Sequence, residues 1–284
     1  MARIERALIS VSNKAGIVGF AKELREMGVE IISTGGTEAK LREEGIDVIP
    51  ISEVTGFPEM MDGRVKTLHP HIHAALLADR DNPAHMREIE DKGIKPIDLV
   101  VVNLYPFAET IARPETTLAE AVEQIDIGGV TLIRAAAKNF AGVAVVTNPK
   151  RYSSILLEMQ RTGGDLTAET RRSLAAEGFR HTAAYDAAIF AYLSRAFEEF
   201  PETLNLVFRK KAELRYGENP HQKGALYQEI GAPATALVFA EQWHGKELSF
   251  NNVLDTDAAW SLVKEFPLPA VVMIKHNNPC GVAT

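Results

Sequence analysis

The feature that most constrains the fold is a nearly continuous apolar run, I-D-L-V-V-V-N-L, at residues 97–104. A strand that is apolar on both faces is typical of a parallel sheet covered by helices on both sides. Helical patterns alternate with this run and with shorter β-branched runs at residues 7–11, 29–34, 46–51 and 142–147. Alternating strands and helices predict an α/β layer structure with right-handed crossovers.

The pattern changes near residue 200. Residues 149–199 are expected to be helical throughout, with Thr167 as an N-cap, whereas a new series of short elements follows them. This series includes a helix near residues 255–266 and an apolar run, A-V-V-M-I, at 270–274, which has the pattern of a buried strand. In this chain we expect the run to lack the strands that should cover it. A chain of 284 residues is long enough for two separate cores. We therefore predict two domains, over residues 1–200 and 201–284.

Composition excludes several classes of protein. The net charge of −7 disfavours a general nucleic-acid-binding surface, which needs excess Lys and Arg. The single cysteine rules out an internal disulfide framework and a Cys-rich zinc site, and it fits a reducing compartment. No run approaches the ~18 uninterrupted apolar residues of a membrane span, and the charged N-terminus lacks the apolar stretch of a secretion signal. We expect a cytoplasmic protein with neither nucleic acid nor membrane as a partner.

Polar and glycine-rich motifs follow the expected strands. They are S-V-S-N-K-A-G (10–16), S-T-G-G-T (33–37), D-G-R-V-K-T-L-H-P (62–70), N-L-Y-P-F (103–107) and Q-I-D-I-G-G-V-T-L-I-R-A-A-A-K-N (124–139). Ligands of open α/β sheets bind at the carboxyl ends of strands, where helix N-termini offer N–H groups to anions. Each motif alone is weak, because such turns are more often helix caps and neither a P-loop nor a dinucleotide motif is present. Together they predict a pocket for a small phosphorylated molecule.

Two features are ambiguous on the residues alone. Lys138 follows three alanines on a helix whose small apolar residues suggest burial, so a functional and an ordinary lysine are equally compatible with the pattern. The H-P-H-I-H run at 69–73 suggests metal ligands, but no carboxylate or cysteine cluster accompanies it and Pro70 disturbs the spacing. We expect no metal.

The chain resembles the bifunctional purine biosynthesis enzymes, AICAR transformylase/IMP cyclohydrolase, in motifs that occur in that family's order along the whole chain. These are S-V-S-N-K, S-T-G-G-T, E-V-T-G-F-P-E-M-M-D-G-R-V-K-T-L-H-P, N-L-Y-P-F, D-I-G-G-V-T-L-I-R-A-A-A-K-N, R-Y-G-E-N-P-H-Q and K-H-N-N-P-C-G. The resemblance implies a methylglyoxal-synthase-like first domain that cyclises formyl-AICAR (FAICAR) to IMP with loss of water. It implies a second, cytidine-deaminase-like α/β domain that formylates AICAR, of which residues 201–284 are expected to be the N-terminal fragment.

The resemblance also implies site residues in the first domain. The nucleotide-binding residues are Ser12, Asn13, Lys14, Thr34, Gly35, Gly36, Thr37, Arg64, Val65, Lys66, Thr67, Asn103, Leu104, Asp126, Ile127 and Gly128. Asn13 is a departure, since many members carry Asp there. Lys138 is expected to be the acid/base group, with Lys66, Tyr105 and Asp126 orienting and polarising the substrate. Such groups suit the reaction, because a weakly nucleophilic amide must lose a proton while the formyl oxygen becomes an oxyanion. No cofactor or metal is expected for it.

In the second domain the resemblance implies an AICAR-binding pair, Arg215 and Tyr216, and a catalytic pair, Lys275 and His276. Its cosubstrate would be 10-formyltetrahydrofolate, but we expect formyl transfer to be absent or marginal in this chain. FAICAR, IMP and AICAR are the expected small-molecule partners, and a homodimer is the expected assembly. Two alternatives stay open: a methylglyoxal-synthase-like phosphate lyase, and a non-catalytic module that binds a phosphorylated ligand.

Overall fold

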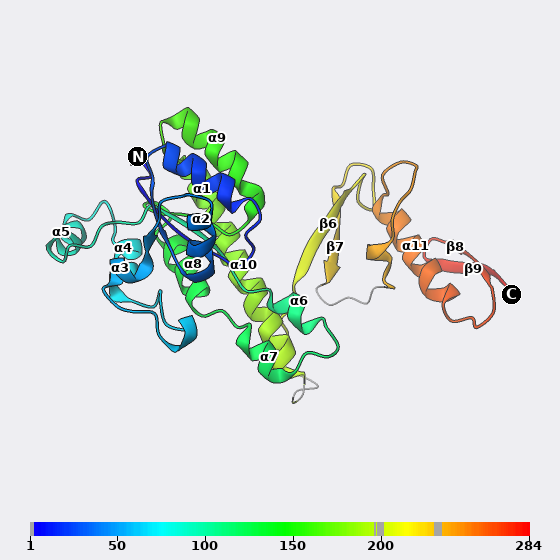
Figure 1. The fold of residues 1–284 in the computed structure, drawn as a ribbon. Helices are drawn as coiled ribbons and strands as arrows, with labels where there is room; N and C mark the ends of the chain where they lie inside the picture. Colours follow the sequence, from blue (N-terminus) through cyan, green and yellow to red (C-terminus); the bar gives the residue numbers. More distant parts are fainter. Residues whose placement is uncertain (1–2, 196, 198–201, 230–234) are drawn as a thin grey trace. The chain divides into compact units, whose positions relative to one another are not determined.

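The computed structural model describes residues 3–195, 197, 202–229 and 235–284. The chain divides into two compact units, Met1–Phe197 and Glu198–Thr284, which we describe separately (Figure 1). The domain boundary expected between residues 200 and 201 falls among residues 198–201, outside the described part.

A parallel sheet of five strands forms the centre of the first unit, in the order β3-β2-β1-β4-β5. The strands are β1 (Arg6–Val11), β2 (Glu30–Ser33), β3 (Ile49–Pro50), β4 (Leu99–Asn103) and β5 (Ala144–Val146). Strand β4 pairs in parallel with both β1 and β5, and its residues Leu99 to Val102 are buried. The apolar run at 97–104 therefore forms a strand buried on both faces, and the prediction of a parallel α/β sheet is confirmed.

Helices cover both faces of this sheet (Figure 1). On one face Ala7 and Ile9 of β1 share a core with α1 (Ile17–Glu26), α2 (Gly35–Glu43) and α9 (Tyr152–Thr162). On the other face Leu8 shares a core with α3 (Ile51–Thr55), α4 (Pro70–Leu77), α5 (Pro83–Asp91), α8 (Gly128–Lys138) and α10 (Ala168–Ser194). Alternate residues of one strand thus enter opposite cores, as the side-chain period of a strand requires. Two shorter helices, α6 (Phe107–Ile111) and α7 (Leu118–Glu123), lie between β4 and α8 in the chain.

Two elements differ from expectation. The third strand spans only Ile49–Pro50 and ends where α3 begins, because proline has no N–H to donate to the ladder. The helical stretch after residue 149 is interrupted at Gly163 and Gly164, whose φ angles of 75° and 103° lie in the left-handed region that favours glycine. Thr167 caps α10 as predicted, accepting a hydrogen bond from Thr170 N–H at 3.2 Å.

The described residues of the second unit include two antiparallel hairpins and an α-helix. The elements are β6 (Phe208–Leu214), β7 (Gly224–Glu229), α11 (Phe250–Val263), β8 (Val271–Lys275) and β9 (Asn278–Ala283). Helix α11 begins earlier than expected, because Ser249 and Asn252 form a capping box. The apolar run at 270–274 is uncovered, as expected for this fragment: Val271 and Met273 are 67% and 60% exposed, since a two-stranded sheet has little to cover its faces. In neither unit does a described helix combine the length and apolar character that a membrane crossing requires.

Candidate active site

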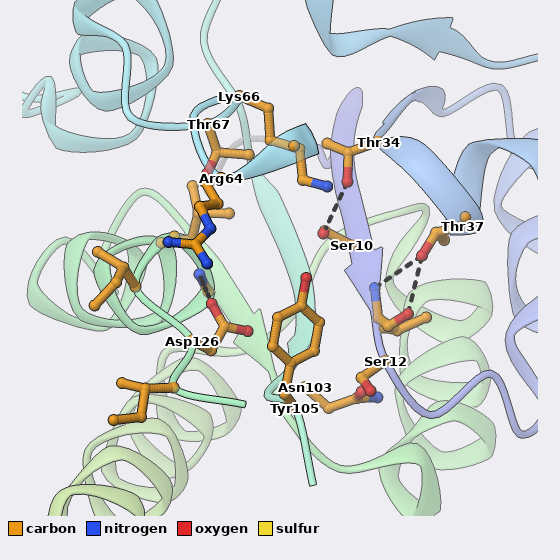
Figure 2. A pocket seen from close by; sticks show the side chains of 18 of the residues that line it. Ser10, Ser12, Thr34, Thr37, Arg64, Lys66, Thr67, Asn103, Tyr105 and Asp126 are labelled. Carbon is orange, nitrogen blue, oxygen red and sulfur yellow. Dashed lines mark hydrogen bonds between the residues drawn. The ribbon is translucent and has the colours of Figure 1, made fainter. Parts of the chain in front are cut away.

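A pocket of about 520 Å³ lies at the edge of the first unit where β1, β2 and β4 end (Figure 2). Most residues of the first domain that are expected to bind the nucleotide or to take part in the reaction line it, although they come from separate segments. These are Ser12, Lys14, Thr34, Gly36, Thr37, Arg64, Lys66, Thr67, Asn103, Tyr105, Asp126, Ile127 and Gly128. Figure 2 shows the side chains of Lys66, Tyr105 and Asp126 around one common space. Parallel strands bring their carboxyl ends to one edge, and this explains why distant motifs meet here.

Four expected residues are not part of the pocket lining, although their neighbours in the sequence are. Asn13 shapes the loop after β1: its Oδ1 accepts a hydrogen bond from Ala15 N–H at 2.9 Å, and its own N–H donates to Asn103 Oδ1 at 2.7 Å. Val65 pairs with Met60 in an isolated bridge, and Leu104 is buried in the core. Gly35 lies under Lys66, whose Nζ would be 3.2 Å from a methyl group at that position. An amide suffices for the Asn13 contact, so Asn in place of Asp is compatible with its structural task.

The structure places Lys138 away from the residues that line the pocket. Gly128 begins α8 and lines the pocket, whereas Lys138 is the last residue of the same helix. At 1.5 Å per residue the two are about 15 Å apart. The Lys138 side chain is exposed, and the buried stripe of α8 consists of Leu132, Ile133, Ala135, Ala136 and Ala137 instead. Lys138 is therefore not among the residues that line the pocket of its own chain, and its acid/base role stays a prediction.

The glycine pair Gly35–Gly36 opens α2 and forms a corner that is suited to an anion. Thr34 precedes the helix with extended backbone and makes no side-chain cap, so the first N–H groups of α2 remain available to a ligand. Lys66 Nζ lies by Gly35, and a methyl group on Gly36 would lie 3.8 Å from Lys14 Nζ. A helix N-terminus beside lysine ammonium groups favours a phosphate.

Hydroxyl groups fix this corner to the first strand. Ser10 Oγ and Thr34 Oγ1 are 3.0 Å apart, and Thr37 Oγ1 accepts from Val11 N–H at 3.1 Å and donates to Val11 O at 3.0 Å (Figure 2). Thr34 and Thr37 are both buried. The beginning of α2 is therefore held rigidly against β1, which pre-organises its N–H groups.

Two ion pairs engage the cations of the loop after α3, one within the loop and one to α7. Lys66 Nζ is 3.1 Å from Glu59 Oε1, and Arg64 pairs with Glu123 of α7. An anionic ligand that uses these cations has to compete with Glu59 and Glu123.

Asp126 is one of two carboxylates among the described residues that line the pocket, and the other, Glu123, is paired with Arg64. Its Oδ1 accepts a hydrogen bond from Gly129 N–H at 2.7 Å, which caps the first turn of α8 (Figure 2). Burial raises the pKa of Asp126 above its ordinary value, although the N–H groups of Gly129 and Tyr105 and the charge of Lys66 oppose this rise. A carboxylate with a raised pKa is a stronger base than an ordinary aspartate, so Asp126 is suited to accept a proton.

The pocket also contains residues that the sequence did not single out. They are Ser10, Val11, Gly63, Val122, Glu123, Ile125, Gly129 and Leu132. Ser10, Val11 and Gly129 belong to motifs noted at strand ends. Their position beside predicted pocket residues was the sequence signal that could have identified them. Val122 and Glu123 belong to α7, and no sequence pattern indicates that this helix reaches the pocket.

In the second unit, the four expected residues are tied to the beginning of α11. Arg215 Cζ lies 4.9 Å from the Tyr216 ring centre, and their backbone groups bond to Leu248 and Phe250. Lys275 ends β8, and His276 forms the tight turn to β9 with a left-handed φ of 50°. The turn bonds to α11 through Asn277 N–H and Asp255 Oδ1, at 2.7 Å. Arg215, Lys275 and His276 are exposed, so the described part of this unit presents no enclosed site around them.

Comparison with known proteins defines the class and then the family. The MGS-like domain family matches residues 16–131, which agrees with the parallel sheet and its edge pocket. The family described as AICARFT/IMPCHase bienzyme matches residues 136–284. The chain belongs to this bienzyme family, and the resemblance inferred from its motifs is confirmed.

The relatives are purine biosynthesis proteins. The bifunctional purine biosynthesis protein PurH of Bacillus mycoides (strain KBAB4) is 59% identical over 279 residues, which are 98% of this chain and 54% of PurH. PurH of Bacillus cytotoxicus is 60% identical over 279 residues, which again are 98% of this chain and 54% of PurH. The chain thus spans about half the length of the curated relatives it matches. The crystal structure of ForH superposes with a TM-score of 0.59 at 35% identity, covering 65% of this chain and 96% of ForH.

Proposed function

We propose that the first unit is an IMP cyclohydrolase that converts FAICAR to IMP. The observation that carries this proposal is the convergence of Lys66, Tyr105 and Asp126 beside an anion-binding helix terminus in a single pocket. The choice of FAICAR as the substrate is supported by the chain's membership of a family of purine biosynthesis enzymes with this activity.

The nucleotide phosphate would bind at the N-terminus of α2, near Lys14. This leaves the base and its two open-ring substituents for the part of the pocket lined by Lys66, Tyr105 and Asp126. A helix N-terminus and a lysine each recognise a phosphate without regard to the base, so base recognition falls to Asn103, Asp126 and their neighbours.

Ring closure joins the carboxamide nitrogen to the formyl carbon. One proton leaves that nitrogen, a second leaves the formamide nitrogen, and the formyl oxygen departs with both as water. In the proposal Asp126 accepts the carboxamide proton, aided by Tyr105, because burial makes its carboxylate more basic. Lys66 stabilises the oxyanion and returns a proton to the departing oxygen, a role for which an ammonium group is suited. The proposed reaction uses no metal or folate.

The test is turnover by the full chain with chelator present. We expect IMP to form from FAICAR, and no methylglyoxal to form from dihydroxyacetone phosphate. Methylglyoxal formation alone would favour the phosphate lyase, and IMP binding without either turnover would favour the non-catalytic module.

The proposal extends to partners and location. FAICAR and IMP are the ligands of the first unit, and AICAR and 10-formyltetrahydrofolate are those of the whole family enzyme. We propose a cytoplasmic homodimer, supported by exposed apolar side chains such as Trp243 and Val271. Light scattering over a dilution series tests the assembly, and a stable monomer at micromolar concentration would contradict it.

A further inference from the structure

We propose that Tyr185 is a positioning residue for cyclisation, which acts by fixing the backbone that carries Asp126. Tyr185 lies on α10, outside the pocket lining. Its hydroxyl donates to Gln124 O at 2.6 Å and accepts from Asp126 N–H at 2.8 Å. This inference rests on the proposed function, because it assumes that Asp126 is the base.

The two hydrogen bonds fall on the short connection between α7 and α8. Gln124 is the C-cap of α7, where carbonyl groups have no partner within the helix, and Ile127 is the N-cap of α8. One tyrosine hydroxyl therefore satisfies a carbonyl at the end of α7 and an N–H just before α8 begins. With Asp126 Oδ1 bonded to Gly129 N–H at 2.7 Å, the backbone and carboxylate of Asp126 are each fixed by a separate bond.

The ring of Tyr185 is itself held in place. It packs edge-on against Phe107, with ring centres 6.1 Å apart, and it adjoins the core cluster of Phe107, Ala121 and Tyr192. Burial raises the pKa of Tyr185 to about 12, so its hydroxyl stays protonated and able to donate at neutral pH. A rigid, neutral donor on a long helix is suited to set the position of a catalytic loop.

Tyr192 provides a matched control. It lies on the same helix, it is buried, and its ring packs edge-on against Phe107 at 5.8 Å. Its hydroxyl forms no hydrogen bond with any other described residue. Tyr192→Phe therefore makes the same chemical change without affecting the connection from Gln124 to Asp126.

The experiment measures FAICAR turnover, IMP affinity and melting temperature for Tyr185→Phe and Tyr192→Phe in the full chain. We expect kcat of Tyr185→Phe to fall by about 10- to 100-fold, as for a catalytic group displaced by a fraction of an ångström to an ångström. KM and the Kd for IMP should stay within about twofold, and Tyr192→Phe should resemble the wild type, because the phosphate corner is unaffected.

A second comparison separates positioning from a general structural effect. Because Tyr185 acts through Asp126, Tyr185→Phe should lower the residual rate no further in an Asp126→Asn background. An unchanged kcat in Tyr185→Phe, or an equal loss in both backgrounds, would overturn the inference while leaving the proposed function in place. Failure of the wild-type chain to turn over FAICAR would overturn the proposed function, and this inference with it.

Discussion

At the scale of single residues, the proposed function divides the pocket into a phosphate corner and a chemical end, and it assigns Lys14 to the first. Charge-assisted hydrogen bonds contribute roughly 1.5–3 kcal/mol each, so Lys14→Ala should weaken IMP binding by about ten- to a hundredfold. Inosine lacks the phosphate, so it should bind more weakly than IMP, and Lys14→Ala should change its affinity little. Calorimetry with both ligands measures this, and equal affinity of the wild type for IMP and inosine would show that the phosphate is not recognised.

Asp126 belongs to the chemical end, and the sign of its pKa shift predicts a pH dependence. Its pKa is raised above 3.8, so the protonated form, which cannot act as a base, persists to higher pH than in an ordinary aspartate. We expect kcat to fall with decreasing pH through an apparent pKa above 3.8, and Asp126→Asn to remove this limb together with most of the rate. A kcat that stays constant as the pH is lowered through the acidic range would exclude Asp126 as the base.

The sequence was informative about residues at strand ends and uninformative about distance along a helix. Ser12, Thr34, Asn103 and Asp126 follow strands or open helices, so the parallel topology alone predicts that they meet. Lys138 shares a motif with Asp126, but Asp126 lies just before α8 begins and Lys138 is the last residue of that helix. Tyr185 is far from every motif, and only the packing of α10 on α8 brings its hydroxyl to the connection.

At the scale of elements, the start of α8 depends on glycine at position 129. A methyl group there would lie 2.8 Å from both Asp126 Oδ2 and Leu104 Cδ2, which is closer than van der Waals contact allows. Gly129→Ala should therefore displace Asp126, lower kcat by about tenfold or more, and reduce stability by about 1–3 kcal/mol. Kinetics and thermal unfolding measure the two effects.

Gly19→Ala on α1 is the matched control, because a methyl group there meets nothing within 4 Å. It should leave turnover unchanged and add up to about 1 kcal/mol of stability, the usual gain of Ala over Gly within a helix. Equal effects of the two substitutions would contradict the steric argument for Gly129.

Which elements could be predicted depended on whether local pattern or tertiary packing decides them. Strands β1, β2, β4 and β5 are marked by buried β-branched residues. Pro50 and Gly163 are sequence signals for the short β3 and for the break between α9 and α10. The spacing of apolar residues instead predicts a longer strand and a continuous helix. In the second unit the pattern indicated a buried strand at 270–274, yet burial depends on neighbouring elements that periodicity does not supply.

At the scale of the whole molecule, the two units should differ in activity. Formyl transfer requires an amine and a folate to be held together away from water, whereas Lys275 and His276 lie at an exposed hairpin turn. We expect the chain to cyclise FAICAR without formylating AICAR from 10-formyltetrahydrofolate. Absorbance of tetrahydrofolate formation measures this, and formyl transfer as fast as cyclisation would show that the second unit is a complete site.

The most direct test of the account is the rate of IMP formation from FAICAR by the Lys66→Ala variant of the full chain. Lys66 is a cation that lies beside Gly35 and beside the space shared by Tyr105 and Asp126. Loss of a group that stabilises the oxyanion and transfers a proton should lower kcat by about 10²–10⁴-fold. A Lys66→Ala chain that forms IMP at the wild-type rate would contradict the assignment of this pocket as the cyclohydrolase site.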